Sequence, residues 1–435
     1  MVLFFYVLKL NNNKNHTIYY YQAPHINNNS YICKKFGTMD VKIFASIVDD
    51  ATKQQVEEAA TCDAYNGCTI RVMPDCHAGS GCTIGSVIRF DKRVVPNTVG
   101  VDIGCGMLVT DLGKVDIDLA ELDRVVTERI PSGFAIHKEP VIYTDMFDDL
   151  NCKQVIDREY MLCSIGTLGG GNHFIELDED EEGRKYLVIH SGSRNLGVKV
   201  CNYWQEKAIA NLTDDSAVRN ELIARLKAEG RQKEIGEELK KLKKPQINKD
   251  LAYIEGVDLA GYLADMRTCQ HYAVVNRVTM ADIICQALGI SYEDRFTTIH
   301  NYIEIETNTI RKGAISAKRG EKVIIPMNMR DGSLICVGKG NEDWLCSAPH
   351  GAGRIMSRAQ AFKSLGMDEF RQSMEGIYTT SVCEGTLDEA PMVYKSADVI
   401  RKDIEPTVDI VKVIKPLWNF KAKTPESGRL MKRET

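Results

Sequence analysis

The amino-acid sequence predicts a mixed α and β fold, an α+β arrangement in one large domain. Short apolar segments alternate with amphipathic helical patterns along the chain, and glycine-rich loops separate them. A chain of 435 residues allows two or three domains, but neither an internal repeat nor a long linker divides it. Hydrophobic residues make up 44% and charged residues 26%, which excludes collagen-like, coiled-coil and wholly disordered proteins.

Residues 1–29 differ from everything that follows. They hold seven asparagines, and no acidic residue precedes Asp40. Polar, asparagine-rich stretches do not pack a core, so we predict a disordered extension at 1–29 and the folded domain at 30–435. The extension has three readings: a dispensable tail, an organelle-targeting segment, or sequence upstream of a later start such as Met39. We favour the dispensable tail, because arginine, which targeting segments use, is absent from it.

The periodicity of the first half predicts short elements. We expect helices at 49–60 and 119–130, and strands at 69–73 and 86–90 on either side of a glycine-rich loop. A more apolar helix follows at 256–287. Its His271 reads as a core residue, so we leave it out of the candidate site.

A charged segment at about 214–245 predicts a projecting helical hairpin. Val218, Leu222 and Leu226 recur every four residues, and Ile235 and Leu239 repeat the spacing. About half of the segment is charged, so solvated helices are the favoured reading. Contact of its lysine-rich end with RNA is the lesser alternative.

The composition also limits the cellular compartment and the classes of partner that the sequence predicts. The 14 cysteines are scattered rather than regularly spaced, which favours a reducing compartment, and we predict the cytoplasm. No apolar run approaches the ~20 residues of a membrane span, so we expect no membrane partner. The net charge of -5 means that a polyanionic partner requires a local basic patch.

Five glycine-rich, polar segments and a sixth polar one, 300–302, carry side chains of the types that hold metals and anions, and together they contain more than half of the nine histidines. Glycines let the backbone approach a ligand closely. The segments are 73–79, 101–106, 169–174, 189–194, 300–302 and 350–354.

Five side chains in these segments form a candidate metal-ligand set: Asp102, Cys105, His173, His190 and His300. Asp102 and Cys105 lie three residues apart on one loop and can reach a shared point, and a thiolate can bridge two metals. Oxygen, nitrogen and sulfur ligands together admit Zn²⁺ or another divalent transition metal, and the carboxylate suits Mn²⁺. A closed structural zinc site is disfavoured, because the chain has no pair of cysteines at CxxC spacing.

His350 has a different setting. Gly351, Ala352, Gly353 and Arg354 follow it and supply backbone N–H donors and a cation, which fits a phosphate held against a nucleophilic imidazole. We predict that Asp75 fixes its tautomer, which makes His350 and Asp75 the candidate catalytic pair. The alternative is that His350 is a sixth metal ligand. Neither a Walker A loop nor a GxGxxG motif is present, so a bound nucleotide requires an unconventional site.

Together, these ordered segments resemble the RtcB family of RNA-splicing ligases, from about residue 31 to 423. The resemblance implies a compact domain with a central β core and a deep cleft, two Mn²⁺ ions, and GTP as co-substrate. It places the metal ligands on the five residues named above and the guanylylated histidine on His350. It places nucleotide contacts on Asn172, His173, Phe174, Ile175, Glu176, His300, Asn301, Pro326, Met327, Asn328, Met329, Ser333, His350, Gly351, Ala352, Gly353 and Lys421.

The implied reaction joins an RNA 3′-phosphate or 2′,3′-cyclic phosphate end to a 5′-hydroxyl end, through a histidine-linked GMP and an RNA 3′-pp-guanosine intermediate. The implied partners are RNA, GTP and an archease-type activator, with a monomeric enzyme. tRNA splicing, sealing of a stress-cleaved transcript and general RNA repair remain open. Two rivals compete: a two-metal phosphoesterase, which forms no covalent nucleotide adduct, and a nucleic-acid-binding module with a structural metal.

Overall fold

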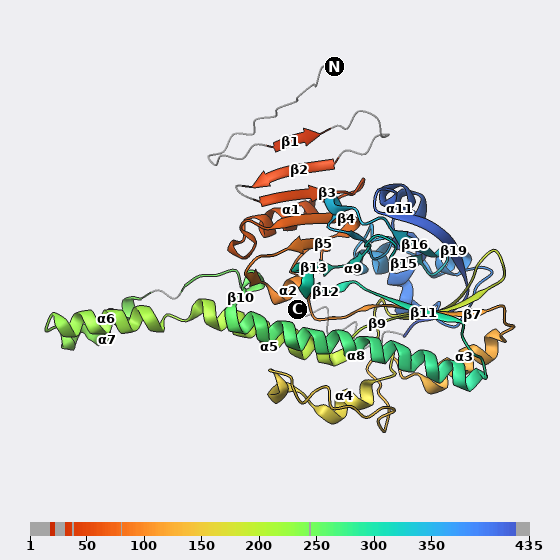
Figure 1. Ribbon diagram of the computed structural model, residues 1–435, viewed down its shortest axis with the longest axis horizontal. Coiled ribbons are helices and arrows are strands. Elements are labelled where there is room, and N and C mark those ends of the chain that lie inside the picture. The colour runs from red at the N-terminus through yellow and green to blue at the C-terminus, as the bar shows by residue number, and fades with distance from the viewer. Residues whose placement is uncertain (1–17, 22–30, 37–38, 80, 243–244, 423–435) are drawn as a thin grey trace, which may run out of the picture.

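The computed structural model describes residues 18–21, 31–36, 39–79, 81–242 and 245–422. Two large sheets lie side by side, and long helices run beneath them in the view of Figure 1. The mixed α and β fold predicted from the sequence is confirmed: the described residues form one compact body around a curved central sheet.

The first sheet contains seven strands in the order β1-β2-β3-β4-β5-β13-β12. All neighbours are antiparallel except β3 and β4. Its strands are Ile18–Tyr21, Tyr31–Phe36, Met39–Ile43, Thr69–His77, Ile84–Arg89, Thr309–Lys312 and Asn301–Glu304 in that order. β4 and β5 contain or largely overlap the strands predicted at 69–73 and 86–90.

The second sheet has the order β11-β7-β9-β8-β19-β16-β15, with β18 pairing beside β19. β11 also contacts β15, so the sheet curls toward closure. Its strands are Asp294–Ile299, Gly106–Gly113, Lys185–Ser191, Phe174–Glu179, Val408–Phe420, Gly332–Gly338, Lys322–Asn328 and, for β18, Tyr378–Thr379. Two small pairs join β6 (Arg93–Val94) to β10 (Ile254–Glu255) and β14 (Ala314–Ser316) to β17 (Ser347–Pro349).

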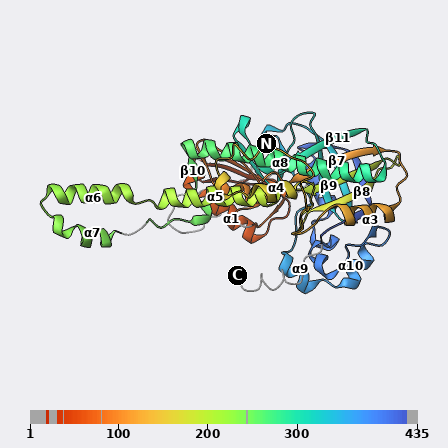
Figure 2. The same cartoon turned by 90° about the horizontal axis from the view of Figure 1, so that it is seen from below.

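A 33-residue helix, α8 (Gly256–Leu288), runs across the molecule, with α5 (Arg194–Thr213) packed along it (Figures 1 and 2). It ends at Gly289, whose φ of 65° is the left-handed conformation that terminates helices. The remaining helices are α1 (Asp50–Ala60), α2 (Pro96–Val99), α3 (Leu119–Arg129), α4 (Arg158–Ser164), α9 (Arg358–Ser364), α10 (Met367–Ser373) and α11 (Ala397–Ile404). The helices predicted at 49–60, 119–130 and 256–287 correspond to α1, α3 and α8.

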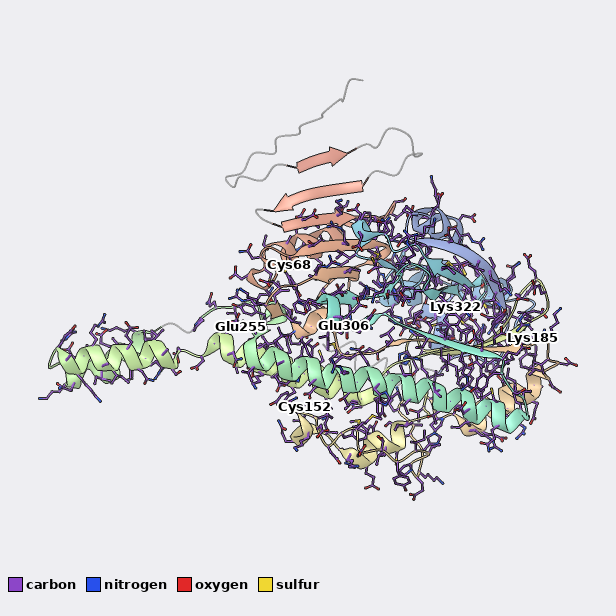
Figure 3. All side chains as sticks on the ribbon, in the orientation of Figure 1. Cys68, Cys152, Lys185, Glu255, Glu306 and Lys322 are labelled. Atoms are coloured by element: carbon purple, nitrogen blue, oxygen red, sulfur yellow. The ribbon has the colours of Figure 1, made fainter. Side chains whose placement is uncertain are left out.

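A helical arm extends from the body, as Figure 2 shows. It consists of α6 (Ser216–Ala228) and α7 (Ile235–Lys241), within the segment predicted as a hairpin. Leu226 is its buried residue, and local ion pairs such as Arg231–Glu234 cover its surface. Glu255, labelled in Figure 3, lies near the base of the arm, where Arg93 Nε donates to its carboxylate over 2.7 Å. Local pairs and solvated charges therefore characterise the arm, whereas packing holds the body.

Of the predicted extension 1–29, the structure describes Ile18–Tyr21, which form strand β1 against β2. These four residues are thus a paired strand rather than disordered chain. The rest of that prediction lies outside the described residues. Within the part of the chain that the structure describes, no helix is both long enough and apolar enough to cross a bilayer.

Apolar packing joins the two sheets to the helices. The largest buried cluster lies between the first sheet and helices α5 and α8, with Trp204, Tyr262 and Tyr272 as its largest members on the helices. A second cluster packs α3 and α8 against one face of the second sheet. The opposite face of that sheet carries a smaller buried cluster that includes Val109, Val188 and Ile414. Phe174, Glu176 and His190 line a cavity next to it.

Candidate metal and nucleotide site

A cleft of about 990 Å³ is bordered by strands of both large sheets and by the loop after β17. Many of the residues predicted for the site line it. These are Asp102, Asn172, Phe174, Glu176, His190, Asn301, Pro326, Met327, Asn328, Met329, His350, Gly351, Ala352, Gly353 and Lys421. Residues far apart in sequence, which the sequence analysis assigned to one site, therefore surround one cavity.

The five predicted metal ligands meet at one edge of the second sheet. β11, β7, β9 and β8 are consecutive neighbours, and the ligands lie on or beside their ends at this edge. The register aligns these ends, since Gly106 pairs with Ile299 and Ser191, and Phe174 pairs with His190. The sheet thus brings together side chains that come from four separate segments.

Cys105 lies at the centre of this donor cluster. Its Sγ is 3.4 Å from His173 Nε2 and 3.3 Å from His190 Nε2. His190 Nε2 is 3.3 Å from His300 Nε2, and His173 Nε2 is 3.0 Å from Asp102 Oδ2. Two donor groups result, Cys105 with His190 and His300, and Cys105 with Asp102 and His173, each with its ligand atoms within 4.8 Å of one another. Cys105 belongs to both groups.

Main-chain carbonyls orient two of the imidazoles. His173 Nδ1–H donates to Leu168 O over 3.0 Å, and His190 Nδ1–H donates to Asn172 O over 3.1 Å. Since a carbonyl only accepts, each ring carries its proton on Nδ1 and presents a bare Nε2 to the cluster. This is the tautomer that a metal-binding histidine requires.

The cluster fits a divalent metal on its own chemistry. Burial, together with neighbouring imidazoles, lowers the pKa of His190 and His300 well below the ordinary histidine value, so both rings are neutral ligands at pH 7. Bare nitrogens 3.3 Å apart repel unless a cation or proton lies between them. Burial and the adjacent Asp102 raise the pKa of the Cys105 thiol well above its usual value, so a cation is needed to hold the thiolate. The residues present therefore fit a metal.

Helix α8 holds the loops of the donor cluster from behind. Asn276 accepts from the N–H groups of Gly166 and Thr167, and its amide donates to Gly192 O over 3.2 Å. Arg277, fully buried, donates to Gly104 O and Ser191 O over 2.9 and 2.7 Å. Both side chains bond to main-chain atoms of the glycine-rich loops, which fixes the loop backbones.

His350 lies next to the cluster but has a different partner. Its Nδ1–H donates to Asp75 Oδ2 over 2.6 Å, and its backbone N–H donates to the same oxygen over 3.1 Å. Asp75 is fully buried, and the His350 ring centroid is 4.7 Å from that of His300. The pairing predicted between Asp75 and His350 thus exists, and it leaves His350 Nε2 as the unprotonated nitrogen beside the donor cluster.

The floor of the cleft comes from β8 and β19. Phe174 and Glu176 project into it, whereas Ile175 is fully buried on the other face of β8, in the core with Leu177 and Ile189. The two-residue period of a strand explains the split. The Ile175 side chain therefore faces away from the cleft in which its neighbours lie. Ser333 is also fully buried, and its Oγ has no partner among the described residues.

A buried ionic group at the cleft wall was missed by the sequence analysis. Glu389 accepts from Lys421 Nζ over 3.1 Å and from Tyr394 OH over 2.6 Å. Burial alone raises the pKa of Glu389, but Lys421, Arg358 and Arg354 outweigh this effect and lower the pKa to about 2. Glu389 lies in no glycine-rich motif, so its sequence context carried no signal. Its anion holds Lys421 at the cleft.

Sequence comparison places this site in a known family. The profile of the family described as tRNA-splicing ligase RtcB matches residues 55–158 and 146–422. RNA-splicing ligase RtcB of Escherichia coli (strain K12) is 32% identical over 383 residues, which cover 79% of this chain and 87% of that protein. tRNA-splicing ligase RtcB of Archaeoglobus fulgidus is 28% identical over 441 residues, covering 80% of this chain and 86% of the relative. With its sequence matched over nearly the whole described region, the chain belongs to the RtcB family.

Proposed function

We propose that this protein is a GTP- and Mn²⁺-dependent RNA ligase that joins an RNA 3′-phosphate or 2′,3′-cyclic phosphate end to a 5′-hydroxyl end. Membership of a family whose relatives carry the name RNA-splicing ligase supports the ligase activity. One observation carries the mechanism. His350, with Nδ1–H held by Asp75, presents Nε2 to the cleft beside a donor cluster built around Cys105. Such an imidazole can act as a nucleophile toward phosphorus.

Two Mn²⁺ ions are the proposed cofactors. Cys105, His190 and His300 would hold one, and Cys105, Asp102 and His173 the other. When bound, they supply Lewis-acid charge that offsets the negative charge of the phosphates. Imidazole, thiolate and carboxylate ligands are all compatible with this metal, and the ligand set also admits Zn²⁺.

The first proposed step is guanylylation of His350. The Nε2 lone pair attacks the α-phosphorus of GTP, an N–P bond forms, and the bond from that phosphorus to the β-phosphate oxygen breaks, releasing pyrophosphate. Asp75 has two roles here. It keeps the proton on Nδ1, so that Nε2 is bare, and its charge stabilises the positive imidazole that forms. Gly351, Ala352 and Gly353 follow His350 along the cleft and allow the phosphate to come close.

The second and third steps transfer the guanylyl group. An oxygen of the RNA 3′-phosphate attacks the phosphorus of the adduct, the N–P bond breaks, and neutral His350 is restored. The RNA 5′-hydroxyl then attacks the activated 3′-phosphate, GMP leaves, and the hydroxyl proton passes to the departing phosphate or to water. At an end with a 2′,3′-cyclic phosphate, water first attacks the phosphorus, the bond to O2′ breaks, O2′ takes up a proton, and a 3′-phosphate results. The ligated product carries a 3′,5′ bond.

Residues of the cleft floor are the proposed nucleotide contacts. Phe174 offers an aromatic face, and Lys421 Nζ lies 5.2 Å from the centre of its ring. Lys421 is fixed by Glu389 and by Asn172 O, 3.4 Å away, and supplies a cation to the nucleotide. Glu176 and Asn301 line the same cavity with polar groups that can read a base or ribose. The contacts with Glu389 and Asn172 keep the Lys421 ammonium in one position.

RNA with the stated ends is the proposed partner, together with GTP and an archease-type activator, and we propose a monomer. The thirteen cysteines from Cys62 to Cys383 are free thiols, which supports a reducing compartment, and we propose the cytoplasm. The physiological RNA, whether split tRNA or damaged RNA, is to be identified by substrate tests.

Incubation with α-labelled GTP and Mn²⁺, followed by a denaturing gel, tests the proposal. We expect label on the wild-type protein and none on His350→Ala. If the wild type takes no label with any divalent metal, even with an activator present, the guanylyl mechanism is wrong. A metal-dependent phosphoesterase, which needs no GTP, then becomes the better assignment.

A further inference from the structure

Lys395 has an unusual environment for a lysine. Its side chain is buried, 3% exposed, between α11 and the turn Pro391–Val393. The ammonium donates three hydrogen bonds to main-chain carbonyls: Ile47 O at 3.0 Å, Pro74 O at 2.8 Å and Cys76 O at 3.0 Å. An ammonium has three N–H donors, so every donor is used. Burial of a charge is unfavourable unless such bonds compensate for it, so a lysine buried in this way suggests a specific role.

Two of the carbonyls that accept from the Lys395 ammonium flank Asp75. Pro74 and Cys76 are the residues on either side of Asp75. By binding both flanking carbonyls, the ammonium fixes the main chain from which the Asp75 carboxylate projects. Asp75 is fully buried and accepts both the Nδ1–H and the backbone N–H of His350. The orientation of His350 thus depends on a stretch of backbone that Lys395 holds.

The main chain of Lys395 makes a second set of contacts, with the loop that follows His350. Its N–H donates to Gly353 O over 2.9 Å, and Ile355 N–H donates to Val393 O over 2.8 Å. These bonds form an antiparallel bridge between the segment of Lys395 and the loop that follows His350. Gly353 has a φ of 73°, and the Asp75 carbonyl lies where a side chain would begin. The two backbones are therefore in direct contact, and only glycine fits there.

Lys395 consequently connects both partners of the Asp75–His350 pair. Its side chain holds the backbone of Asp75, and its main chain holds the loop of His350. Lys395 does not line the cleft, so it does not reach the nucleotide.

We propose that Lys395 is a positioning residue for guanylyl transfer, which holds Asp75 and the His350 loop so that Nε2 faces the α-phosphorus of GTP. The proposal rests on the proposed function, because it concerns the histidine that carries GMP. It predicts a selective effect. Steps that form or break the N–P bond need His350 in place, whereas attack of the 5′-hydroxyl on an already activated 3′-phosphate does not.

The test compares two reactions of Lys395→Met, a substitution that keeps the length of the side chain and removes the ammonium. One is formation of the labelled GMP adduct in a single turnover. The other is sealing of an RNA prepared with a 3′-pp-guanosine end, which bypasses His350. We expect adduct formation to slow about 100-fold, the size expected for a misplaced reacting group, while sealing of the activated RNA stays within about threefold of wild type.

Lys339→Met is the matched control. Lys339 Nζ also donates to a main-chain carbonyl, Glu405 O at 2.6 Å, and pairs with Asp409 at 3.0 Å, but it follows β16 and does not line the cleft. It should leave both reactions unchanged. If Lys395→Met forms the adduct at the wild-type rate, or if it loses both reactions together, Lys395 has only a structural role and the proposal is overturned.

A double-mutant cycle with Asp75→Asn tests whether Lys395 acts on adduct formation through Asp75. If Lys395 acts through Asp75, Lys395→Met should slow adduct formation by less than about threefold in the Asp75→Asn background. Additive losses in the double variant would contradict a shared route. Wild-type protein that takes no label would instead refute the proposed function, an outcome separate from failure of the Lys395 proposal.

Discussion

Three histidines of the site, His173, His190 and His350, differ in the partner of Nδ1. His173 and His190 donate from Nδ1 to main-chain carbonyls, whereas His350 donates from Nδ1 to the buried carboxylate of Asp75. A carbonyl fixes the tautomer but supplies no charge. A carboxylate fixes the tautomer and also stabilises the ring once it becomes positive. The first setting suits a metal ligand, and the second suits a nitrogen that must form and later break a covalent bond.

Removing the nucleophile should give the largest effect. We expect His350→Ala to form no GMP adduct and to seal no 3′-phosphate RNA, because the variant offers no nitrogen to the α-phosphorus. Mn²⁺ binding, measured by titration calorimetry, should persist, since His350 lies outside both donor groups. Loss of Mn²⁺ binding in this variant would mean that His350 is a sixth metal ligand, and the contrast between the two kinds of histidine would fail.

Cys105→Ala should give the next largest effect. Because Cys105 belongs to both donor groups, its loss should weaken Mn²⁺ binding at least about 100-fold and abolish ligation. Calorimetry measures the first and RNA sealing the second. A Cys105→Ala enzyme with full turnover would be incompatible with two metals sharing this thiolate.

Asp75→Asn tests the carboxylate itself. The amide keeps the size of the side chain but removes the charge that stabilises a positive His350, so we expect adduct formation to slow by about 10–100-fold. Mn²⁺ affinity should stay within about twofold of wild type. Equal rates in the variant and the wild type would show that the carboxylate adds nothing beyond what a carbonyl partner provides.

A smaller effect should come from Asp178, a carboxyl below the cleft floor. It is fully buried, and neither carboxylate oxygen has a partner among the described residues. Burial raises the pKa of Asp178 well above its usual value, and burial and Asp178 together raise that of Glu176. The folded state then binds more protons than the unfolded state, so stability falls as pH rises above the unfolded pKa near 4. Asp178→Asn removes the part of this slope that Asp178 contributes.

The measurement is the difference in Tm between pH 5.5 and pH 8, where no change of fold is expected. It should be smaller in Asp178→Asn than in wild type. An equal difference in the two proteins would mean that Asp178 is ionised in the folded state, and that a cation or water satisfies it.

The smallest effect is expected at His271, on the exposed side of α8. His271→Ala should leave adduct formation and Mn²⁺ binding unchanged and alter stability by less than about 0.5 kcal/mol, as surface substitutions do. Thermal unfolding and the labelled-GTP assay check this. A loss of adduct in this variant would show that histidines outside the cleft take part.

The candidate metal ligands could be predicted from the sequence because few types of side chain bind metals, and most of these lie in glycine-rich segments. Asp102, Cys105 and the three histidines were identified by type alone. Lys395 and Glu389 were not, because lysine and glutamate are common on surfaces and their burial arises only from folding. His271 shows the converse error: the apolar pattern of its helix suggested burial, yet the residue is exposed.

The fold, too, could be predicted only in part: the helices were located, but the order of the strands was not. Helical periodicity located α1, α3 and α8, since local spacing determines which side of a helix is buried. Strand order depends on pairing between distant segments, such as β13 beside β5 and β19 between β8 and β16, and no local pattern records it. Strand β1 pairs instead with the next strand in sequence, β2, and it was missed because the composition of its segment suggested disorder.

The long helix α8 also anchors the backbones of the loops that carry the metal-type residues. Asn276 and Arg277 reach out from the helix and bind main-chain atoms of segments 104, 166–167 and 191–192. The loops add bonds of their own, since Ser191 Oγ donates to Leu168 O over 2.8 Å and Ser193 Oγ donates to Ile103 O over 2.5 Å. Helix and loops together therefore fix the backbones from which Asp102, Cys105, His173 and His190 project. A change in α8, outside the cleft, would consequently alter the spacing of the donor atoms without removing any of them.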